Sequence, residues 1–367
     1  MATSRLHELS THGVSVWMDS LSREMLETGE LARLMEEDAV VGVTSNPTIF
    51  QKALAEGDWY DEQLQAVSRE TEDPTDIFIA LAQEDIRDAC DLMAPVWERT
   101  NGVDGFVSLE VDPRLAYDRV ATYDQAMRFH EWIDRPNLFV KIPATQEGLG
   151  AIEECIARGR SINVTLIFSL ERHREVAQAY IRGLERLAEA GGDLSTVGSV
   201  ASYFVSRVDT EADRRLDEAG HPELKGKLAV ANAKLAYQNY KEIFSGDPWE
   251  ALVEKGATPQ WCLWASTSTK NPEYRDVLYV EDLIGAGTVN TMPRETIEAF
   301  QDHGEVALTL EDGIDEARQV FEQVAEAGVD YDDVTDTLER EGVQKFVDSL
   351  TQLLDGIAAK RGQLAAA

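Results

Sequence analysis

The strongest constraint on this chain's fold is a regular alternation of short apolar segments and amphipathic stretches. Eight segments have strand length and apolar or β-branched composition, and most are separated by residues with helical spacing of apolar side chains. They lie near residues 15, 40, 105, 138, 161, 196, 260 and 277 and read SVWMDS, VVGVTSN, GFVSLEVD, LFVKIPAT, SINVTLIF, TVGSVASYFV, QWCLWAST and VLYVEDLI. Strand and helix alternating eight times predict an α/β fold, a (β/α)8 barrel with additional helices.

Four parts of the chain depart from a plain barrel. The connections at 47–104 and 206–259 are long enough for extra helices, whereas the link STKNPEYRD before the eighth segment is too short for a normal helix. The tail at 291–367 has the pattern of two or three helices, which we expect to pack outside the barrel. Because no linker rich in Pro, Gly or Ser interrupts the chain, we expect one domain over 1–367 with this helical extension at its end.

Charge and cysteine usage limit the classes of function. A net charge of −34, from 68 acidic and 34 basic residues, argues against a nucleic-acid surface and against a polybasic membrane patch. The three cysteines are far apart and imply no disulfide framework. The N-terminus, MATSRLHELSTHG, lacks the apolar core of a signal peptide, and no window reaches transmembrane length. We therefore expect a cytoplasmic protein with neither nucleic acid nor membrane as a partner.

Motifs for metals and nucleotides are missing from the sequence. The six histidines lack metal-ligand spacing, and neither an HExxH motif nor a P-loop is present. The GAG at 285–287 is too weak for a dinucleotide fingerprint. We expect no metal and no cofactor.

Polar side chains recur where the expected strands end, which is where barrel enzymes carry their reacting groups. Strand residues two apart share a face, so Asn163 and Thr165 point the same way, as do Ser202 and Phe204. We expect one set of polar residues to line the barrel mouth: Asp19, Asn46, Glu110, Lys141, Asn163, Thr165, Ser202 and Ser266.

Each of these residues also has an ordinary explanation. A strand lysine usually lies at an edge or extends to water, Asp19 could cap the next helix, and Glu110 could be a solvated strand end. Asn46 begins the turn sequence NPT, and NVT at 163–165 matches a glycosylation sequon within an expected core strand. An inner barrel strand has no edge, however, and the joint pattern is harder to explain by chance than any single residue.

The segment NLFVKIPAT places one charged side chain, Lys141, within an apolar run. A neutral lysine amine attacks ketones and forms a Schiff base, and burial disfavours the charged form of an amine. Making and breaking the imine needs proton transfers, which the carboxyl groups of Glu110 and Asp19 could divide between them. Three further polar side chains would hold sugar hydroxyls, namely Asn46, Asn163 and Ser202. The residues thus predict a lysine-dependent aldol reaction.

Six stretches give the chain a resemblance to the transaldolase family, in its longer bacterial form. They are GVTSNPTIF, SLEVDP, VKIPAT, INVTLIFS, SYFVSRVD and WASTSTKNPEYRDVLYVEDLI, and they occur in the family's order. The resemblance extends from about residue 15 to about residue 350. Such a set of motifs is highly specific.

The resemblance implies roles for individual residues. Lys141 matches the Schiff-base lysine, Glu110 the acid/base that works through a water, and Thr165 the residue that positions this water. Asp19 matches the acid/base at the hydroxyl whose proton is lost in bond cleavage. The dihydroxyacetone part would be bound by Asn46, Asn163 and Ser202.

The implied phosphate site contains one departure from the family pattern. Arg207 and Ser266 match phosphate-binding residues, but many relatives carry an arginine two positions beyond the serine. Ser268 occupies that place here, within STSTKN, and Lys270 is the nearest cation. We expect Lys270 to take the role as a point charge, without the bidentate geometry of an arginine.

The implied reaction moves a dihydroxyacetone unit from sedoheptulose 7-phosphate to glyceraldehyde 3-phosphate, giving erythrose 4-phosphate and fructose 6-phosphate. Its partners are small-molecule sugar phosphates, and both a monomer and a homodimer remain open. One alternative is a Schiff-base aldolase that releases free dihydroxyacetone. Phe204 favours the transferase, because a phenylalanine adds no hydroxyl that could aid release of the enamine. A second alternative, a non-catalytic sugar-phosphate binding protein, leaves the acids beside Lys141 unexplained.

Overall fold

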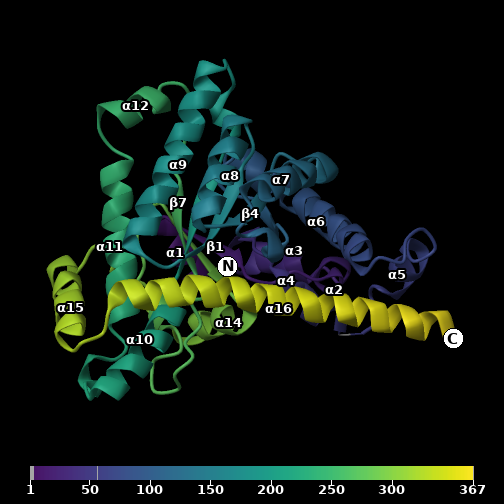
Figure 1. The fold of residues 1–367 in the computed structure, drawn as a ribbon. Coiled ribbons are helices and arrows are strands. Elements are labelled where there is room, and N and C mark those ends of the chain that lie inside the picture. The colour runs from purple at the N-terminus through teal and green to yellow at the C-terminus, as the bar shows by residue number, and fades with distance from the viewer. Residues whose placement is uncertain (1–3, 56, 367) are drawn as a thin grey trace.

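The structure, a computed structural model that describes residues 4–55 and 57–366, is built around a closed barrel of eight parallel strands (Figure 1). Each strand pairs with its sequence neighbours, and the last pairs with the first. This confirms the predicted (β/α)8 fold. The strands are β1 (Val14–Met18), β2 (Val40–Val43), β3 (Val107–Glu110), β4 (Leu138–Pro143), β5 (Ile162–Ile167), β6 (Ser199–Phe204), β7 (Trp261–Ala265) and β8 (Thr288–Met292).

The predicted position of the eighth strand is wrong. The apolar segment at 277–284 contains the short helix α13 (Leu278–Glu281), whereas β8 is the more polar stretch TVNTM. An apolar run of this length suits a buried helix as well as a strand, so composition alone misassigns it. All five residues of β8 are buried, and hydroxyls such as that of Thr288, which donates to the Gly285 carbonyl oxygen at 2.7 Å, find partners inside. The short link before the expected strand therefore lies within one longer β7–β8 connection.

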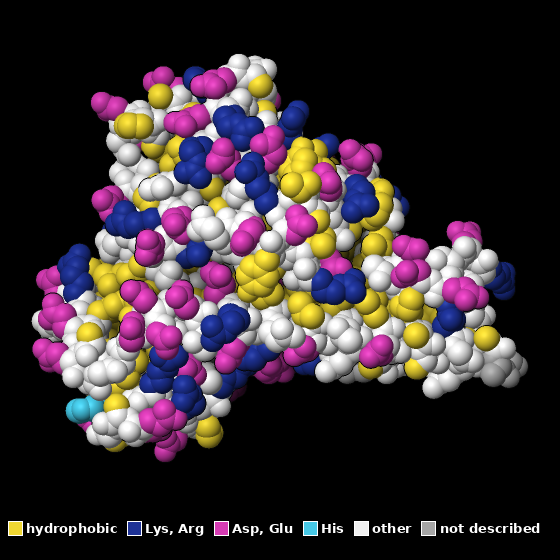
Figure 2. Space-filling view, in the orientation of Figure 1, with side chains coloured by type: hydrophobic (Ala, Val, Ile, Leu, Met, Phe, Trp, Pro, Cys, Tyr) yellow, Lys and Arg dark blue, Asp and Glu magenta, His cyan; other side chains and the backbone are white. Residues whose placement is uncertain are grey.

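Helices surround the barrel, and both long connections hold the extra helices predicted for them. The helices before β6 are α1 (Arg5–Thr11), α2 (Arg23–Glu27), α3 (Glu30–Glu37), α4 (Pro47–Ala55), α5 (Asp61–Val67), α6 (Pro74–Arg99), α7 (Arg119–Ile133), α8 (Gln146–Ala157) and α9 (Leu170–Glu189), with the short 3-10 helices η1 (Pro113–Leu115) and η2 (Leu194–Thr196). After β6 come α10 (Ser206–Ala219), η3 (Pro222–Leu224), α11 (Leu228–Ile243), α12 (Asp247–Val253), α14 (Arg294–His303), α15 (Ile314–Glu326) and α16 (Tyr331–Ala366). Within the described residues, no helix is long and apolar enough to cross a membrane. Acidic and basic side chains are interspersed over the face of the molecule shown in Figure 2.

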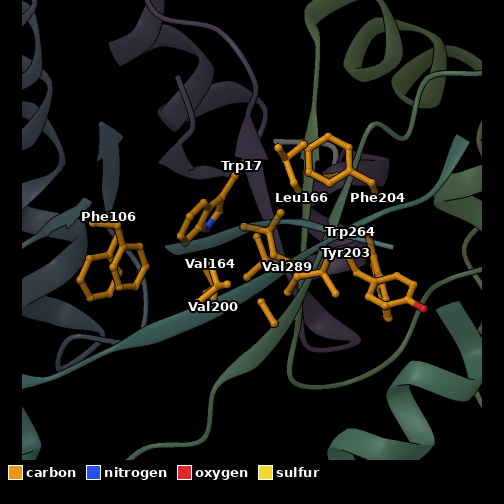
Figure 3. Close-up of a cluster of buried hydrophobic side chains, with 14 of the residues drawn as sticks. Trp17, Phe106, Val164, Leu166, Val200, Tyr203, Phe204, Trp264 and Val289 are labelled. Carbon is orange, nitrogen blue, oxygen red and sulfur yellow. The ribbon is translucent and has the colours of Figure 1, made fainter. Parts of the chain in front are cut away.

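Aromatic side chains fill the barrel on the amino-terminal side of Lys141. Phe106 and Phe139 stack with ring centroids 3.8 Å apart, and Trp17 lies 6.1 Å from Phe139; Trp17 and Phe106 appear in the buried cluster of Figure 3. Glycine is required at position 42, because a Cβ there would come within 2.4 Å of the Trp17 ring. Since Phe139 precedes Lys141 by two residues on the same strand face, this cluster forms an apolar floor beneath the lysine.

The tail contains three helices, and the longest of them, α16, crosses the molecule (Figure 1, yellow). It packs against α4, α6, α10 and η1, and it also contacts β5. Three of these elements, α4, α10 and η1, begin directly after the carboxyl ends of barrel strands. The helix therefore lies over the end of the barrel where reacting groups are expected.

Candidate active site

A cavity of about 300 Å³ opens at the carboxyl ends of the strands. It brings together nine of the residues singled out from the sequence: Asp19, Asn46, Lys141, Thr165, Ser202, Phe204, Arg207, Ser266 and Lys270. The other two, Glu110 and Asn163, do not line the cavity but lie buried directly behind residues that do. The predicted set therefore forms one contiguous group.

Lys141 lies inside the barrel with only 4% of its surface exposed. Strand register places it level with Glu110 on one side and Asn163 on the other. Its Nζ donates a hydrogen bond to the carbonyl oxygen of Ser45 at 3.1 Å and lies 3.5 Å from Oε2 of Glu110. One acceptor and one carboxyl group thus hold the amine at the cavity.

Glu110 is 7% exposed, and neither of its carboxylate oxygens has a hydrogen-bond partner among the described residues. A second, mostly apolar cavity of about 30 Å³ lies beside it, with Phe50 and Phe129 in its walls. Burial raises the pKa of Glu110 to about 7, although the nearby Lys141 ammonium opposes this shift. The carboxyl group can therefore take up or release a proton near neutral pH, as general acid–base catalysis requires.

Asp19 directly follows β1, and its half-buried carboxylate accepts a hydrogen bond from one threonine, which a second threonine contacts in turn. Thr44 donates to Oδ1 at 2.6 Å, and its hydroxyl also lies 2.7 Å from that of Thr291. Burial raises the pKa of Asp19, while Lys141 and the Thr44 hydrogen bond act to lower it. The site thus has a second carboxyl group, with its own hydrogen-bonding environment, from a different strand.

A buried hydrogen-bond network links the amide and hydroxyl groups of β3, β5 and β6. Asn163 donates to Oγ of Ser108 at 3.1 Å and accepts from Ser202 at 2.7 Å. Thr165 lines the cavity, and its buried hydroxyl has no partner among the described residues. Leu166 adopts a left-handed φ of 60° where the β5–β6 register shifts, so the regular alternation ends just after Thr165. The free hydroxyl is available to a ligand or a water.

Two cationic groups, Arg207 and Lys270, lie on the side of the cavity formed by β6 and β7. The Arg207 guanidinium lies 5.0 Å from the Phe204 ring centroid, and its buried Nη1 has no partner among the described residues. Asn46 lies across the barrel at the start of α4, where its side chain accepts a hydrogen bond from the amide of Ile49. Lys270 is exposed at the rim and donates to Ser268 at 2.6 Å. A negatively charged group would be attracted to the Arg207 and Lys270 side of the cavity.

Three hydrogen bonds between side chains fasten α10 to the β7–β8 connection. The hydroxyls of Ser206 and Ser266 lie 2.9 Å apart, and Ser266 has a left-handed φ of 56°. Further along α10, Asp209 accepts from Tyr279 at 2.7 Å, and Asp213 accepts from Tyr274 at 2.5 Å. Because Arg207 follows Ser206 directly, these contacts also determine where Arg207 lies relative to Ser266 and Lys270.

The sequence does not point to several other side chains that line the cavity, among them Thr44, Lys52, Glu295 and Phe346. Thr44 adjoins a predicted strand end, so the search for polar residues at strand ends could have found it. Lys52, Glu295 and Phe346 lie on the helices α4, α14 and α16. No signal in the sequence relates α16 to the barrel mouth, because the relationship arises only from packing.

The fold and the cavity define a class of protein: a (β/α)8-barrel protein with a buried lysine and two carboxyl groups at the carboxyl ends of its strands. A family model for transaldolase/fructose-6-phosphate aldolase matches residues 16–357. The chain belongs to this family.

Named relatives support this assignment over nearly the full length. Transaldolase of Frankia alni is 53% identical over 362 residues, which cover 98% of each chain. Transaldolases of Acidothermus cellulolyticus and Thermobifida fusca are also 53% identical, covering 96% and 97% of this chain and 95% and 98% of their own. The chain is thus an enzyme, of the transferase class.

Proposed function

We propose that this enzyme transfers a dihydroxyacetone unit from sedoheptulose 7-phosphate to glyceraldehyde 3-phosphate through a Schiff base on Lys141. The supporting observation is the pairing of a buried amine with a buried carboxyl group, 3.5 Å apart, beside a cavity lined by Asp19. Nucleophilic attack on a ketone followed by proton transfer requires such a pair.

In the proposed first half-reaction, Nζ of Lys141 attacks the ketone carbon of the donor. Glu110 gives a proton to the departing hydroxyl of the carbinolamine, through a water held by Thr165, and water leaves as the imine forms. Asp19 then takes the proton from the donor's C4 hydroxyl, the C3–C4 bond breaks, and erythrose 4-phosphate departs. The electron pair of that bond remains on the enzyme-bound three-carbon unit as an enamine.

In the second half-reaction, the enamine carbon attacks the aldehyde of glyceraldehyde 3-phosphate, and Asp19 returns its proton to the new hydroxyl. Water then hydrolyses the imine, which releases fructose 6-phosphate and the free lysine. Asn46, Asn163 and Ser202 hold the hydroxyls of the three-carbon unit. Arg207, Ser266 and Lys270 attract the phosphate.

Borohydride trapping tests the proposal. The enzyme is incubated with fructose 6-phosphate and sodium borohydride, and its intact mass and peptide map are measured. We expect a covalent adduct of the three-carbon unit on Lys141, and no adduct in the Lys141→Met variant. An enzyme that binds fructose 6-phosphate without forming an adduct would contradict the mechanism.

The alternative reaction in this family is release of free dihydroxyacetone by an aldolase. Phe204 supports transfer, because its ring packs 5.3 Å from that of Phe168 and carries no hydroxyl to protonate the enamine. With fructose 6-phosphate alone, we expect glyceraldehyde 3-phosphate to form only in about the amount of enzyme present, until an acceptor aldose is added. Continuous release without an acceptor would instead identify an aldolase.

A further inference from the structure

Arg207 is partly buried, and it reaches the cavity without an acidic partner in the part of the chain that the structure describes. Among the described residues, no carboxylate lies within ion-pair distance of its guanidinium, although the chain has twice as many acidic as basic residues. Burial lowers the pKa of Arg207, while Asp19 and Glu110 favour its charged form from further away. No ion pair within the described ranges therefore fixes the position of this cation.

Two aromatic rings lie beside this cation instead. The carbon at the centre of the guanidinium lies 5.0 Å from the ring centroid of Phe204 and 5.9 Å from that of Phe346. Both distances are within the range of a cation–π interaction, which attracts the charge without using its N–H donors. The donors of Arg207 therefore remain free for a ligand.

Phe346 comes from α16, far from the barrel strands in sequence. Its side chain is 4% exposed, and it is the one described residue of α16 that lines the main cavity. Three residues later, Ser349 lies 2.7 Å from Thr48 of α4, so a hydrogen bond fixes this part of α16 against an element of the mouth. Packing thus sets the position of the ring independently of any ligand.

We propose that Phe346 is a positioning residue for substrate phosphate, acting through Arg207. This inference rests on the proposed function and adds to it a residue that contacts the cation. The ring holds the guanidinium at the cavity, and because it is not an anion it leaves the guanidinium unpaired until phosphate arrives. A carboxylate in its place would compete with the phosphate, whereas an aliphatic residue would fill the space without attracting the charge.

The first test measures inorganic phosphate binding to the full-length enzyme by calorimetry. We expect Phe346→Leu to weaken phosphate binding about tenfold, and Phe346→Trp, which keeps an aromatic face, to retain most of the affinity. Leu353→Ala is the matched control, because Leu353 is buried on α16 but lies away from the main cavity. This control should lower stability and leave phosphate affinity within about twofold of the original protein.

The second test compares borohydride trapping by fructose 6-phosphate and by dihydroxyacetone, which has no phosphate. In Phe346→Leu, the half-saturating concentration should rise about tenfold for fructose 6-phosphate and stay unchanged for dihydroxyacetone. A merely structural role would affect both compounds equally, and that result would overturn the inference. So would unchanged phosphate binding in Phe346→Leu, or a Phe346→Trp variant no better than the leucine variant. If the unaltered enzyme bound phosphate but formed no adduct with either compound, the proposed function would be contradicted. The phosphate affinities measured by calorimetry would still test the role of Phe346.

Discussion

The lysine side and the phosphate side of the cavity are built in different ways. Lys141, Glu110 and Asn163 lie on adjacent strands at one level, and the hydrogen bonds of the barrel determine their register. Arg207 instead lies in the first turn of α10 and Lys270 lies on a loop, so their positions depend on contacts between distant elements. We therefore expect changes on the lysine side to alter chemistry at nearly constant affinity. Changes on the phosphate side should alter affinity at nearly constant chemistry.

The largest expected effect comes from Glu110→Gln. The amide keeps the shape of the side chain but cannot exchange a proton, so kcat for the transfer reaction should fall by about 10²- to 10⁴-fold. KM for fructose 6-phosphate should change by less than about threefold, because Glu110 does not line the cavity. Steady-state kinetics measures both. If Glu110→Gln acted mainly by raising KM, the lysine side would affect affinity, and the contrast with the phosphate side would not hold.

Arg207→Met tests the opposite side. Removing a charge-assisted hydrogen bond to phosphate should lower kcat/KM for glyceraldehyde 3-phosphate by about 100-fold. The value for glyceraldehyde, which lacks the phosphate, should stay within about threefold. Arg207→Lys keeps the charge but loses the planar group that faces Phe204, so we expect only partial recovery. Equal losses with both acceptors would show that Arg207 also takes part in the chemistry.

Glu110 should also make stability depend on pH. Its pKa rises from 4.5 to about 7 in the folded protein, so the folded state binds the proton more tightly than the unfolded chain. The contribution of Glu110 to the free energy of unfolding is therefore fully present below about pH 4.5. It is lost as the pH rises toward 7, by about 3 kcal/mol in total.

Since glutamine does not titrate, Glu110→Gln should raise Tm relative to the original protein more at about pH 8 than at about pH 5. Thermal unfolding at both values measures this. Glu62→Gln is the control, because Glu62 is exposed on α5. A gain in Tm for Glu110→Gln that does not depend on pH would mean that the carboxyl group is not destabilised by burial.

The same contrast explains how much could be predicted from the sequence. The level shared by Glu110 and Lys141 follows from strand alternation and barrel register, both of which are local and periodic. Composition does not indicate the eighth strand, because TVNTM owes its burial to its place in the barrel. Phe346 could not be found, since nothing local indicates that its helix crosses the mouth.

On the phosphate side, the sequence motif indicates only one of the two lysines that lie near the proposed phosphate-binding end of the cavity or across from it, namely Lys270. The missing arginine near Ser266 suggested Lys270 as its replacement, and the structure places Lys270 on the cavity. Lys52 of α4 lines the cavity as well, a second cation that the sequence motif does not indicate.

Mutating these lysines gives the smallest expected effect and the finest test of the comparison. An exposed ammonium contributes little and is screened by salt, so Lys270→Met should raise KM for fructose 6-phosphate only about two- to fivefold, and less so at high salt. Lys255→Met is the matched control, because it makes the same charge change on an exposed residue away from the cavity. If Lys255→Met raised KM as much, the effect would reflect the net charge of −34 and not a contact. If Lys52→Met alone raised KM, the phosphate would lie toward α4, and the division of the cavity into a lysine side and a phosphate side at β6 and β7 would have to be redrawn.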